Sequence, residues 1–195
     1  MVETRRRRQI EDVASELFRE RGYEGTSVRD IARALDIRGA SLYAHVTSKE
    51  DVLWAIVDRA ACAFETTAAF ADERTHDQPA RVRLRAHVEA HLGVVTADPE
   101  AASVFDREWR HLRGGRRAAM LERRDAYERR LRELIQDGTG HGEFVEVDPS
   151  LAAAFLLTSL NAVASWYRPD GALSAAAITH AYADMAVRSL TEAGR

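Results

Sequence analysis

Three side chains that can bind an anion lie close together in the first quarter of the chain. Tyr43, His45 and Lys49 each offer a hydrogen-bond donor, and Lys49 is the only lysine among the 28 basic residues. Thr47 and Ser48 just before it are typical helix caps, which places Lys49 in the first turn of a helix. The unpaired N–H groups of such a turn favour an anion. The spacing therefore predicts a clamp for a phosphate group.

Three helical patterns lie within the first 46 residues, which include Tyr43 and His45 of this clamp. Apolar residues at helical spacing predict a first helix that ends at Gly22 and a second helix after it. Thr26 or Ser27 can cap the start of the second helix, and Asp30, three residues after Ser27, resembles the partner in a capping box. A turn near residues 36–38 leads to a third pattern, residues 39–46, of only two turns. Two helices joined by a short turn are typical of the helix-turn-helix, whose second helix enters the major groove of DNA.

The candidate contacts with DNA divide into two sets. The outer side of the third helix would face base edges, because Leu42 and Val46 point back to the core. Thr26 or Ser27, at the start of the second helix, would bind the backbone across the groove from the clamp, and such phosphate contacts fix the register. The full set of candidates is Thr26, Ser27, Arg38, Gly39, Ala40, Ser41, Tyr43, His45 and Lys49.

The rest of the chain continues the helical pattern almost without strand signals. A long helix follows Ser48 and about five more follow it, two of which begin at Pro99 and Pro149, where proline is tolerated in the first turn. The sequence predicts an all-α protein of about nine helices. A helix-turn-helix domain is expected over residues 1–47 and a second helical domain over residues 48–195.

Composition limits the function classes and the compartment. The net charge of −3 argues against a polycationic protein that binds nucleic acid or membrane through its overall charge. The single cysteine, Cys62, cannot form a disulfide within the chain, which fits a reducing cytoplasm. No apolar segment that would indicate a signal peptide follows the N-terminus. The apolar run at residues 151–167 is short for a membrane span and carries polar residues, so a buried helix of a soluble protein is favoured.

The stretch TSVRDIARALDIRGASLYAHVTSKEDVL resembles the signature of TetR-type transcriptional regulators, with its Thr, its Ile-Ala pair, its Leu-Tyr-x-His and its Ser-Lys-Glu. The resemblance covers about residues 8 to 56. Two positions depart from the family pattern. Asp36 replaces the usual turn glycine and must take the turn conformation without glycine's freedom. Val46 replaces the usual phenylalanine, which leaves a smaller plug under the recognition helix.

The resemblance implies a homodimer on a palindromic double-stranded DNA operator, paired through its last two long helices, which here are rich in alanine. The helices between residues 65 and 138 would then enclose a pocket for a small effector. The candidate lining residues are Phe64, His87, His91, Phe105, Glu108, Trp109, Tyr127 and Trp166. The C-terminal part loosely resembles the branch that senses acyl-coenzyme A thioesters. Arginines such as Arg107, Arg123 and Arg124 could meet the nucleotide phosphates of such a thioester, or they could form an ordinary exposed charged helix face.

Other chemistry is weakly supported. His87 and His91 are four residues apart, which suits a metal on a helix, but no third ligand is evident, so neither a metal nor another cofactor is expected. Catalysis has no candidate nucleophile, because Cys62 sits on an apolar helix. The sequence favours an effector-responsive regulator, acting as a repressor and not as an enzyme, over a small all-α enzyme or a DNA-binding module without ligand.

Overall fold

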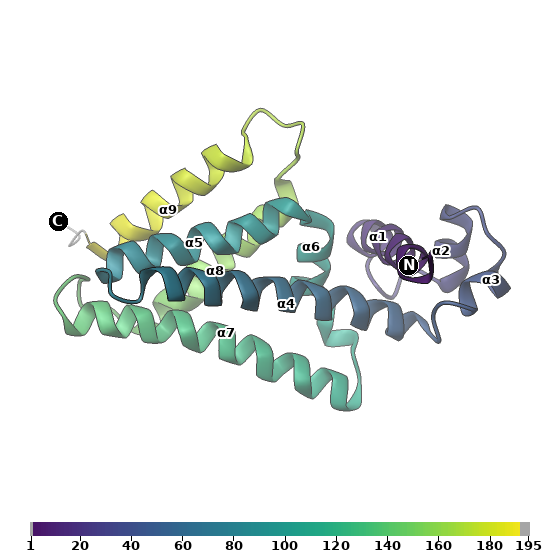
Figure 1. Cartoon of the computed structure of the whole chain (residues 1–195), viewed down its shortest axis with the longest axis horizontal. Coiled ribbons are helices and arrows are strands. Elements are labelled where there is room, and N and C mark those ends of the chain that lie inside the picture. The colour runs from purple at the N-terminus through teal and green to yellow at the C-terminus, as the bar shows by residue number, and fades with distance from the viewer. Residues whose placement is uncertain (1, 192–195) are drawn as a thin grey trace. The chain divides into compact units, whose positions relative to one another are not determined.

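The computed structural model describes residues 2–191, and the side chains of residues 5–39 and 41–191. Within these residues the chain forms nine α-helices and one 3-10 turn and contains no strand, which confirms the all-α fold (Figure 1). The elements are α1 (Val2–Arg21), α2 (Val28–Ala34), α3 (Gly39–Tyr43), α4 (Lys49–Thr75), α5 (Ala80–Ala97), α6 (Pro99–Arg107), η1 (Trp109–His111), α7 (Gly114–Gly140), α8 (Pro149–Trp166) and α9 (Ala175–Thr191).

The helices belong to two compact units. The first unit contains the chain up to Ala61 together with Glu100–Leu121, and the second contains Cys62–Pro99 and the chain from Glu122 onward. These units are not divided at residues 47 and 48, because the first half of α4 packs into the core of the first unit. The boundary predicted between residues 47 and 48 concerns which part binds DNA and which part binds an effector. It stays a prediction.

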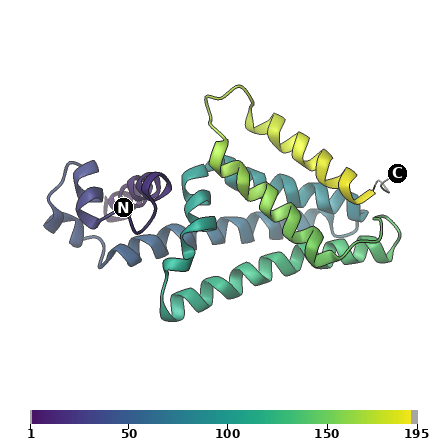
Figure 2. The same ribbon diagram turned by 180° about the vertical axis from the view of Figure 1, so that it is seen from behind.

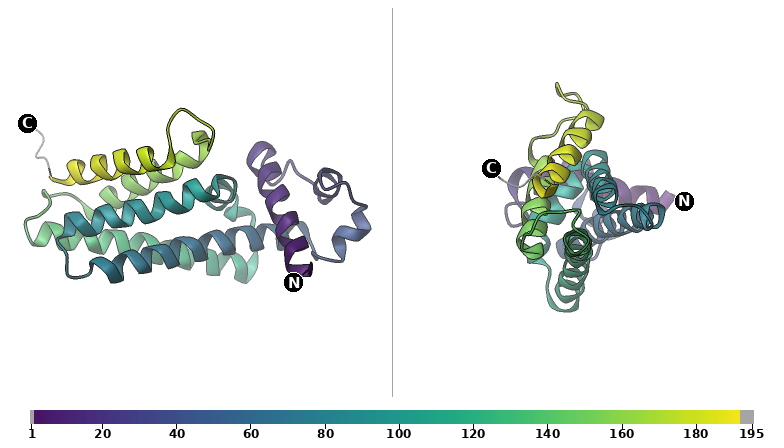
Figure 3. Two further views of the ribbon diagram at one scale, coloured as in Figure 1. Left: turned by 45° about the horizontal axis from the view of Figure 1, so that its top comes forward. Right: turned by 90° about the vertical axis from the view of Figure 1, so that its left-hand side faces the viewer.

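The first unit packs α1, α2 and α3 around one apolar core (Figure 3). The largest fully buried side chains of α1, α2 and α3 are Phe18, Ile31 and Leu42, one from each helix, with Ile10 of α1 beside them. Leu53 of α4 joins the same core, as do residues of α6 and the start of α7. The short α3 therefore does not depend on its own helix propensity, since burial of Leu42 holds it in place.

The turn between α2 and α3 is a Schellman motif with aspartate in the place of glycine. The Ile37 N–H donates to the Ala32 carbonyl at 3.0 Å and the Asp36 N–H donates to the Arg33 carbonyl at 3.1 Å. This pattern requires a left-handed residue at the first position after the helix cap. Asp36 takes that conformation with φ of 52°, as the sequence predicted for a residue that replaces glycine here.

Because a left-handed residue with a side chain is strained, replacing Asp36 should change stability in a predictable direction. We expect Asp36→Gly to raise the free energy of unfolding by about 0.5 kcal/mol, the relief of strain being partly offset by glycine's greater freedom when unfolded. Asp36→Ala should lower it by about 1 kcal/mol, since alanine lacks the local tolerance of aspartate. Urea unfolding of the three proteins measures both changes, and a less stable glycine variant would contradict the account.

The second unit is built around α5. Seven residues of α5 are buried, and the helix contacts both α8 and α9 (Figures 1 and 2). Asp148 caps α8 by accepting the N–H groups of Ser150 and Leu151, with Pro149 in the first helical position, as the sequence predicted. By length and composition α8 is the one helix among residues 2–191 that could cross a membrane, a test that core helices of soluble proteins also pass.

Candidate nucleic-acid interface and buried polar cluster

The burial of the residues of α3 and just after it follows the pattern predicted from the sequence. Leu42 and Val46 are buried, while Ser41, Tyr43 and Arg38 are exposed and Gly39 is half-buried. Arg38 is the N-terminal cap residue of α3 and makes no capping hydrogen bond with its side chain. The structure describes no side chain for Ala40, so that prediction lies outside the described side chains. The first helical turn of α3 thus presents polar side chains to solvent.

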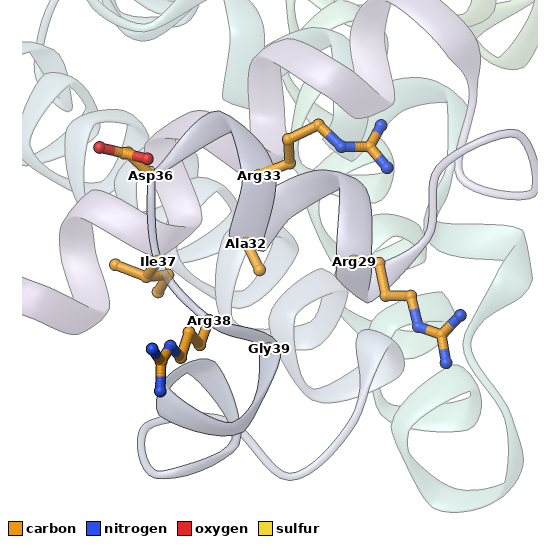
Figure 4. A pocket seen from close by; sticks show the side chains of 7 residues that line it. All are labelled: Arg29, Ala32, Arg33, Asp36, Ile37, Arg38 and Gly39. Atoms are coloured by element: carbon orange, nitrogen blue, oxygen red, sulfur yellow. The ribbon is translucent and has the colours of Figure 1, made fainter.

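A shallow hollow next to this turn has a basic rim. It is lined by Arg29, Ala32, Arg33, Asp36, Ile37, Arg38 and Gly39, and Figure 4 shows the guanidinium groups of the three arginines pointing outward around it. Arg33 lies 3.3 Å from Asp30, a pair on the surface of α2. Arg29 and Arg33 were not among the DNA-contacting residues predicted from the sequence. Their spacing of four residues on one short helix is the signal that would have identified them, because such residues share a face.

The two candidates at the start of α2 differ in exposure. Thr26 is 1% exposed, and its hydroxyl lies 3.2 Å from the Leu17 carbonyl and 3.0 Å from the Gly22 carbonyl, to which it donates. Its side chain therefore holds the α1–α2 loop and is not presented at the surface, contrary to the role expected for it. Ser27 is exposed and forms the predicted capping box with Asp30.

The three residues of the expected clamp also differ. Tyr43 is 58% exposed, and His45 is half-buried, with no partner for its shielded Nδ1 among the described residues. The Lys49 ammonium donates to the carbonyls of Tyr23 at 2.8 Å and Thr26 at 2.9 Å. Partial burial lowers the pKa of Lys49. Two of its three hydrogens thus tie α4 to the α1–α2 loop, and the ammonium also lies 4.1 Å from the centroid of the Tyr23 ring.

Three residues expected in the effector pocket belong instead to the first unit. Trp109 and Phe105 pack into the core of that unit. The buried Glu108 carboxylate accepts the N–H of Tyr23 at 3.2 Å. These contacts support the α1–α2 loop and place Phe105, Glu108 and Trp109 in the first unit, whereas His87 belongs to the second. Helical periodicity indicates that a residue is buried, but it does not say in which core.

Four of the other expected pocket residues do come together in the second unit. The ring centroids of Phe64 and His91 are 4.7 Å apart, and those of His87 and Tyr127 are 5.3 Å apart. His91 is also bonded on both ring nitrogens, with Tyr127 at 3.0 Å and Asn161 at 3.1 Å. We call these five residues from α4, α5, α7 and α8 the polar cluster. Asn161, one of several polar residues in α8, was not among the pocket residues predicted from the sequence.

Burial keeps the polar cluster uncharged. Desolvation lowers the pKa of His87 to about 4 and that of His91 to about 3, with smaller contributions from nearby charges. Desolvation also raises the pKa of Tyr127 well above its usual range. Neutral rings suit hydrogen bonding to an uncharged group. Within the described part of the chain, no three His, Cys, Asp or Glu side chains gather as ligands for a metal ion.

Trp166, the eighth expected pocket residue, lies at the end of α8 and is 44% exposed. It belongs to a row of exposed apolar side chains on that helix. Leu151, Phe155, Ala162 and Trp166 are spaced by four, seven and four residues and therefore share one face, while Leu156, Leu160 and Val163 are buried on the other. We call the exposed row, Leu151, Phe155, Ala162 and Trp166, the α8 stripe.

The comparisons with known proteins agree with this architecture. Residues 10–56 match the family of bacterial regulatory proteins called the tetR family, and residues 77–190 match a tetracyclin repressor-like C-terminal domain. The transcriptional repressor KstR2 of Rhodococcus jostii (strain RHA1) is 29% identical over 189 residues, which cover 95% of this chain and 91% of KstR2.

Solved structures give the same result. The TetR family regulator PfmR from Thermus thermophilus is 34% identical, with a TM-score of 0.79 over 92% of this chain and 97% of PfmR. AibR, solved in complex with isovaleryl coenzyme A and operator DNA, is 30% identical, with a TM-score of 0.79 over 95% of this chain and 98% of AibR. With its helix-turn-helix and most of its remaining helices matched, the chain belongs to the TetR family of DNA-binding transcriptional regulators.

Proposed function

We propose that this protein is a homodimeric, cytoplasmic repressor that leaves a palindromic operator when an acyl-coenzyme A thioester binds in its second unit. The observation that carries the proposal is the exposed polar surface of α3 beside the arginines of α2, in a chain whose relatives are repressors. A single such surface reads few base pairs, so regulators of this kind act as two-fold dimers on two half-sites.

The α8 stripe supports the dimer. It leaves large apolar side chains uncovered on a helix whose opposite face is already packed in the second unit. Large apolar side chains exposed together on one helix face indicate an interaction site. On α9 the exposed Ala177, Ala181 and Met185 follow the same helical spacing. Two copies joined through α8 and α9 would bury both rows in a four-helix bundle.

The choice of effector is supported by AibR, which was solved with isovaleryl coenzyme A, and by the loose C-terminal resemblance. The polar cluster supplies a buried group of aromatic and polar side chains that suits the acyl part of such a molecule. Of the arginines expected to meet the phosphates, Arg123 is held by Glu65 at 2.6 Å and lies 3.1 Å from Cys62. Its guanidinium is therefore engaged within the protein.

The proposed response passes along α4. Leu53 of this helix is in the core of the first unit, and Phe64 belongs to the polar cluster. An effector that displaces Phe64 would move α4, and Lys49 at its start would carry the α1–α2 loop with it. A small tilt is enough, because the two recognition helices of a dimer must match successive major grooves.

The test needs an operator and a panel of thioesters. Duplexes selected from a random pool by the purified protein would give the operator, and fluorescence anisotropy would then follow its release by isovaleryl, octanoyl, benzoyl and cyclohexanecarbonyl coenzyme A. We expect at least one thioester to release the operator at micromolar concentration, and free coenzyme A to release little. If no thioester of the panel binds the protein or releases the operator, the acyl-coenzyme A proposal is wrong. The repressor assignment would then still stand.

Salt dependence separates the two kinds of DNA contact. We expect Lys49→Ala to weaken binding to operator and random duplex about equally, and to flatten the slope of log affinity against log salt by about one per protomer. Changing Arg38 or Ser41 should instead alter the preferred half-site, with about 1–3 kcal/mol lost per mismatched contact. Binding isotherms at several salt concentrations measure both effects.

The control for Lys49→Ala is a measurement of its melting temperature, because the Lys49 ammonium also donates to two carbonyls of the α1–α2 loop. A loosened loop would lower the affinity without removing a phosphate contact, and the salt slope would then stay unchanged. An unchanged slope in Lys49→Ala, together with a lower melting temperature, would assign Lys49 to the loop alone.

A further inference from the structure

His87 is the one member of the polar cluster with a buried hydrogen-bonding capacity that the described chain leaves unused. Its side chain is fully buried in α5, and neither Nδ1 nor Nε2 has a hydrogen-bond partner among the described residues. Buried polar atoms are nearly always hydrogen-bonded, since leaving them unpaired costs free energy. His91, one turn further on, follows the rule with a partner on each nitrogen.

The hydrogen bonds of the neighbouring residues fix which groups remain available. The Asn161 Oδ1 atom can only accept, so the His91 Nε2 atom carries a hydrogen and donates to it. The Nδ1 atom of the neutral His91 ring is then an acceptor, and the Tyr127 hydroxyl donates to it. The hydroxyl hydrogen of Tyr127 is therefore already used. His87 keeps one N–H donor and one lone-pair acceptor, in whichever tautomer it adopts.

The surroundings of His87 favour an uncharged partner. The Tyr127 ring packs against it at 5.3 Å between centroids. Arg130 is the charged group that acts on His87, and its guanidinium lies 3.3 Å from the Asp72 carboxylate, which neutralises it. A carboxylate or phosphate brought here would lose its water without gaining a free cation. A carbonyl oxygen can accept the His87 N–H, and a hydroxyl group can use both ring nitrogens.

We propose that His87 binds a neutral oxygen atom in the acyl part of the effector, a keto or hydroxyl oxygen remote from the phosphates of coenzyme A. The protein would then respond to oxygenated acyl thioesters in preference to their saturated hydrocarbon counterparts. This inference rests on the proposed function, in which an acyl thioester occupies the second unit. His91, Tyr127 and Asn161 hold the site in shape, and His87 makes the contact.

Matched thioesters that differ by one oxygen test the inference. Octanoyl is compared with 3-oxooctanoyl and 3-hydroxyoctanoyl coenzyme A, and cyclohexanecarbonyl with 4-oxocyclohexanecarbonyl coenzyme A, by calorimetry and by operator release. For at least one pair the unaltered protein should favour the oxygenated member by about tenfold or more, because a site built for a hydrogen bond rejects the analogue that lacks it. In His87→Phe the preference should fall to near one.

A second variant and a spectroscopic measurement keep the result interpretable. His87→Leu repeats the test if the larger ring of His87→Phe does not fold. His76→Phe is the control, since the ring of His76 is exposed and lies outside the polar cluster, and it should retain the preference. Nitrogen-15 NMR of the histidine-labelled protein should show His87 without a hydrogen bond in the free state and with one after the oxygenated thioester is added.

The outcomes separate the inference from the proposed function. If no thioester of any kind binds, the effector class is wrong, and the inference falls with it. If both members of every pair bind equally well, or the preference survives in His87→Phe and His87→Leu, the thioester effector stands and the role of His87 is wrong. Nitrogen-15 shifts that show both His87 nitrogens hydrogen-bonded in the free protein identify a buried water as its partner, which also overturns the inference.

Discussion

Phe155→Asp is expected to convert the protein from a dimer into a monomer at micromolar concentration. Phe155 is 64% exposed in the middle of the α8 stripe, so in the proposed bundle its ring would be buried by the partner. Burying a phenylalanine contributes about 1.5–3 kcal/mol, and two-fold symmetry makes each substitution count twice. The two new carboxylates must also lose water. The combined loss, about 5 kcal/mol or more, raises the dimer dissociation constant by at least roughly a thousandfold.

The same variant should lose operator binding, although its DNA-reading surface is untouched. Two linked recognition helices bind as one unit, and separated monomers lose that advantage, which is worth a factor of about 10²–10⁴. Light scattering after size exclusion measures the mass against the 21.8 kDa of one chain, and anisotropy measures operator affinity. Ala126→Asp is the control, because Ala126 is exposed on another helix, α7, of the same unit. A dimeric Phe155→Asp protein would contradict the proposed interface.

The parts of this fold that could be predicted from the sequence are those set by local rules. The capping box of Ser27 and Asp30 and the proline starts of α6 and α8 depend on residues within one helical turn, and the structure confirms them. The left-handed Asp36 was likewise predictable, because a known turn demanded that conformation whatever residue filled it. The apolar periodicity of each helix then gave the all-α fold.

The parts that could not be predicted depend on contacts between distant segments. Lys49 follows a helix cap, which suggested a phosphate contact, but its ammonium meets the carbonyls of Tyr23 and Thr26, more than twenty residues earlier. Trp109 and Tyr127 are both buried aromatic residues at helical spacing, and only the packing separates the core of the first unit from the polar cluster. The role of Asn161 in the polar cluster could not be predicted, because its hydrogen-bond partner lies on another helix and leaves no local pattern in the sequence.

The stability of the protein should fall steeply between pH 6.5 and pH 5 because of the two buried histidines. Burial lowers the pKa of His87 from 6.5 to about 4 and that of His91 from 6.5 to about 3. In this pH range the unfolded chain binds protons at both positions and the folded protein does not, so unfolding takes up protons. The stabilisation is complete above pH 6.5 and is lost as the pH falls, by up to about 1.4 kcal/mol per pH unit for each histidine.

His87→Phe isolates one histidine from the many other groups that titrate in acid. Between pH 7 and pH 5 the unaltered protein should lose about 2 kcal/mol more than the variant, the free energy of one withheld proton over 1.5 pH units. Urea unfolding at pH 7, 6 and 5 measures the difference. His76→Phe is the control, since the ring of His76 is exposed and its loss should leave the unaltered slope. Parallel stability curves for His87→Phe and the unaltered protein would mean that His87 already gains a proton or a hydrogen bond in the folded state, and would count against the neutral site proposed for the effector's oxygen.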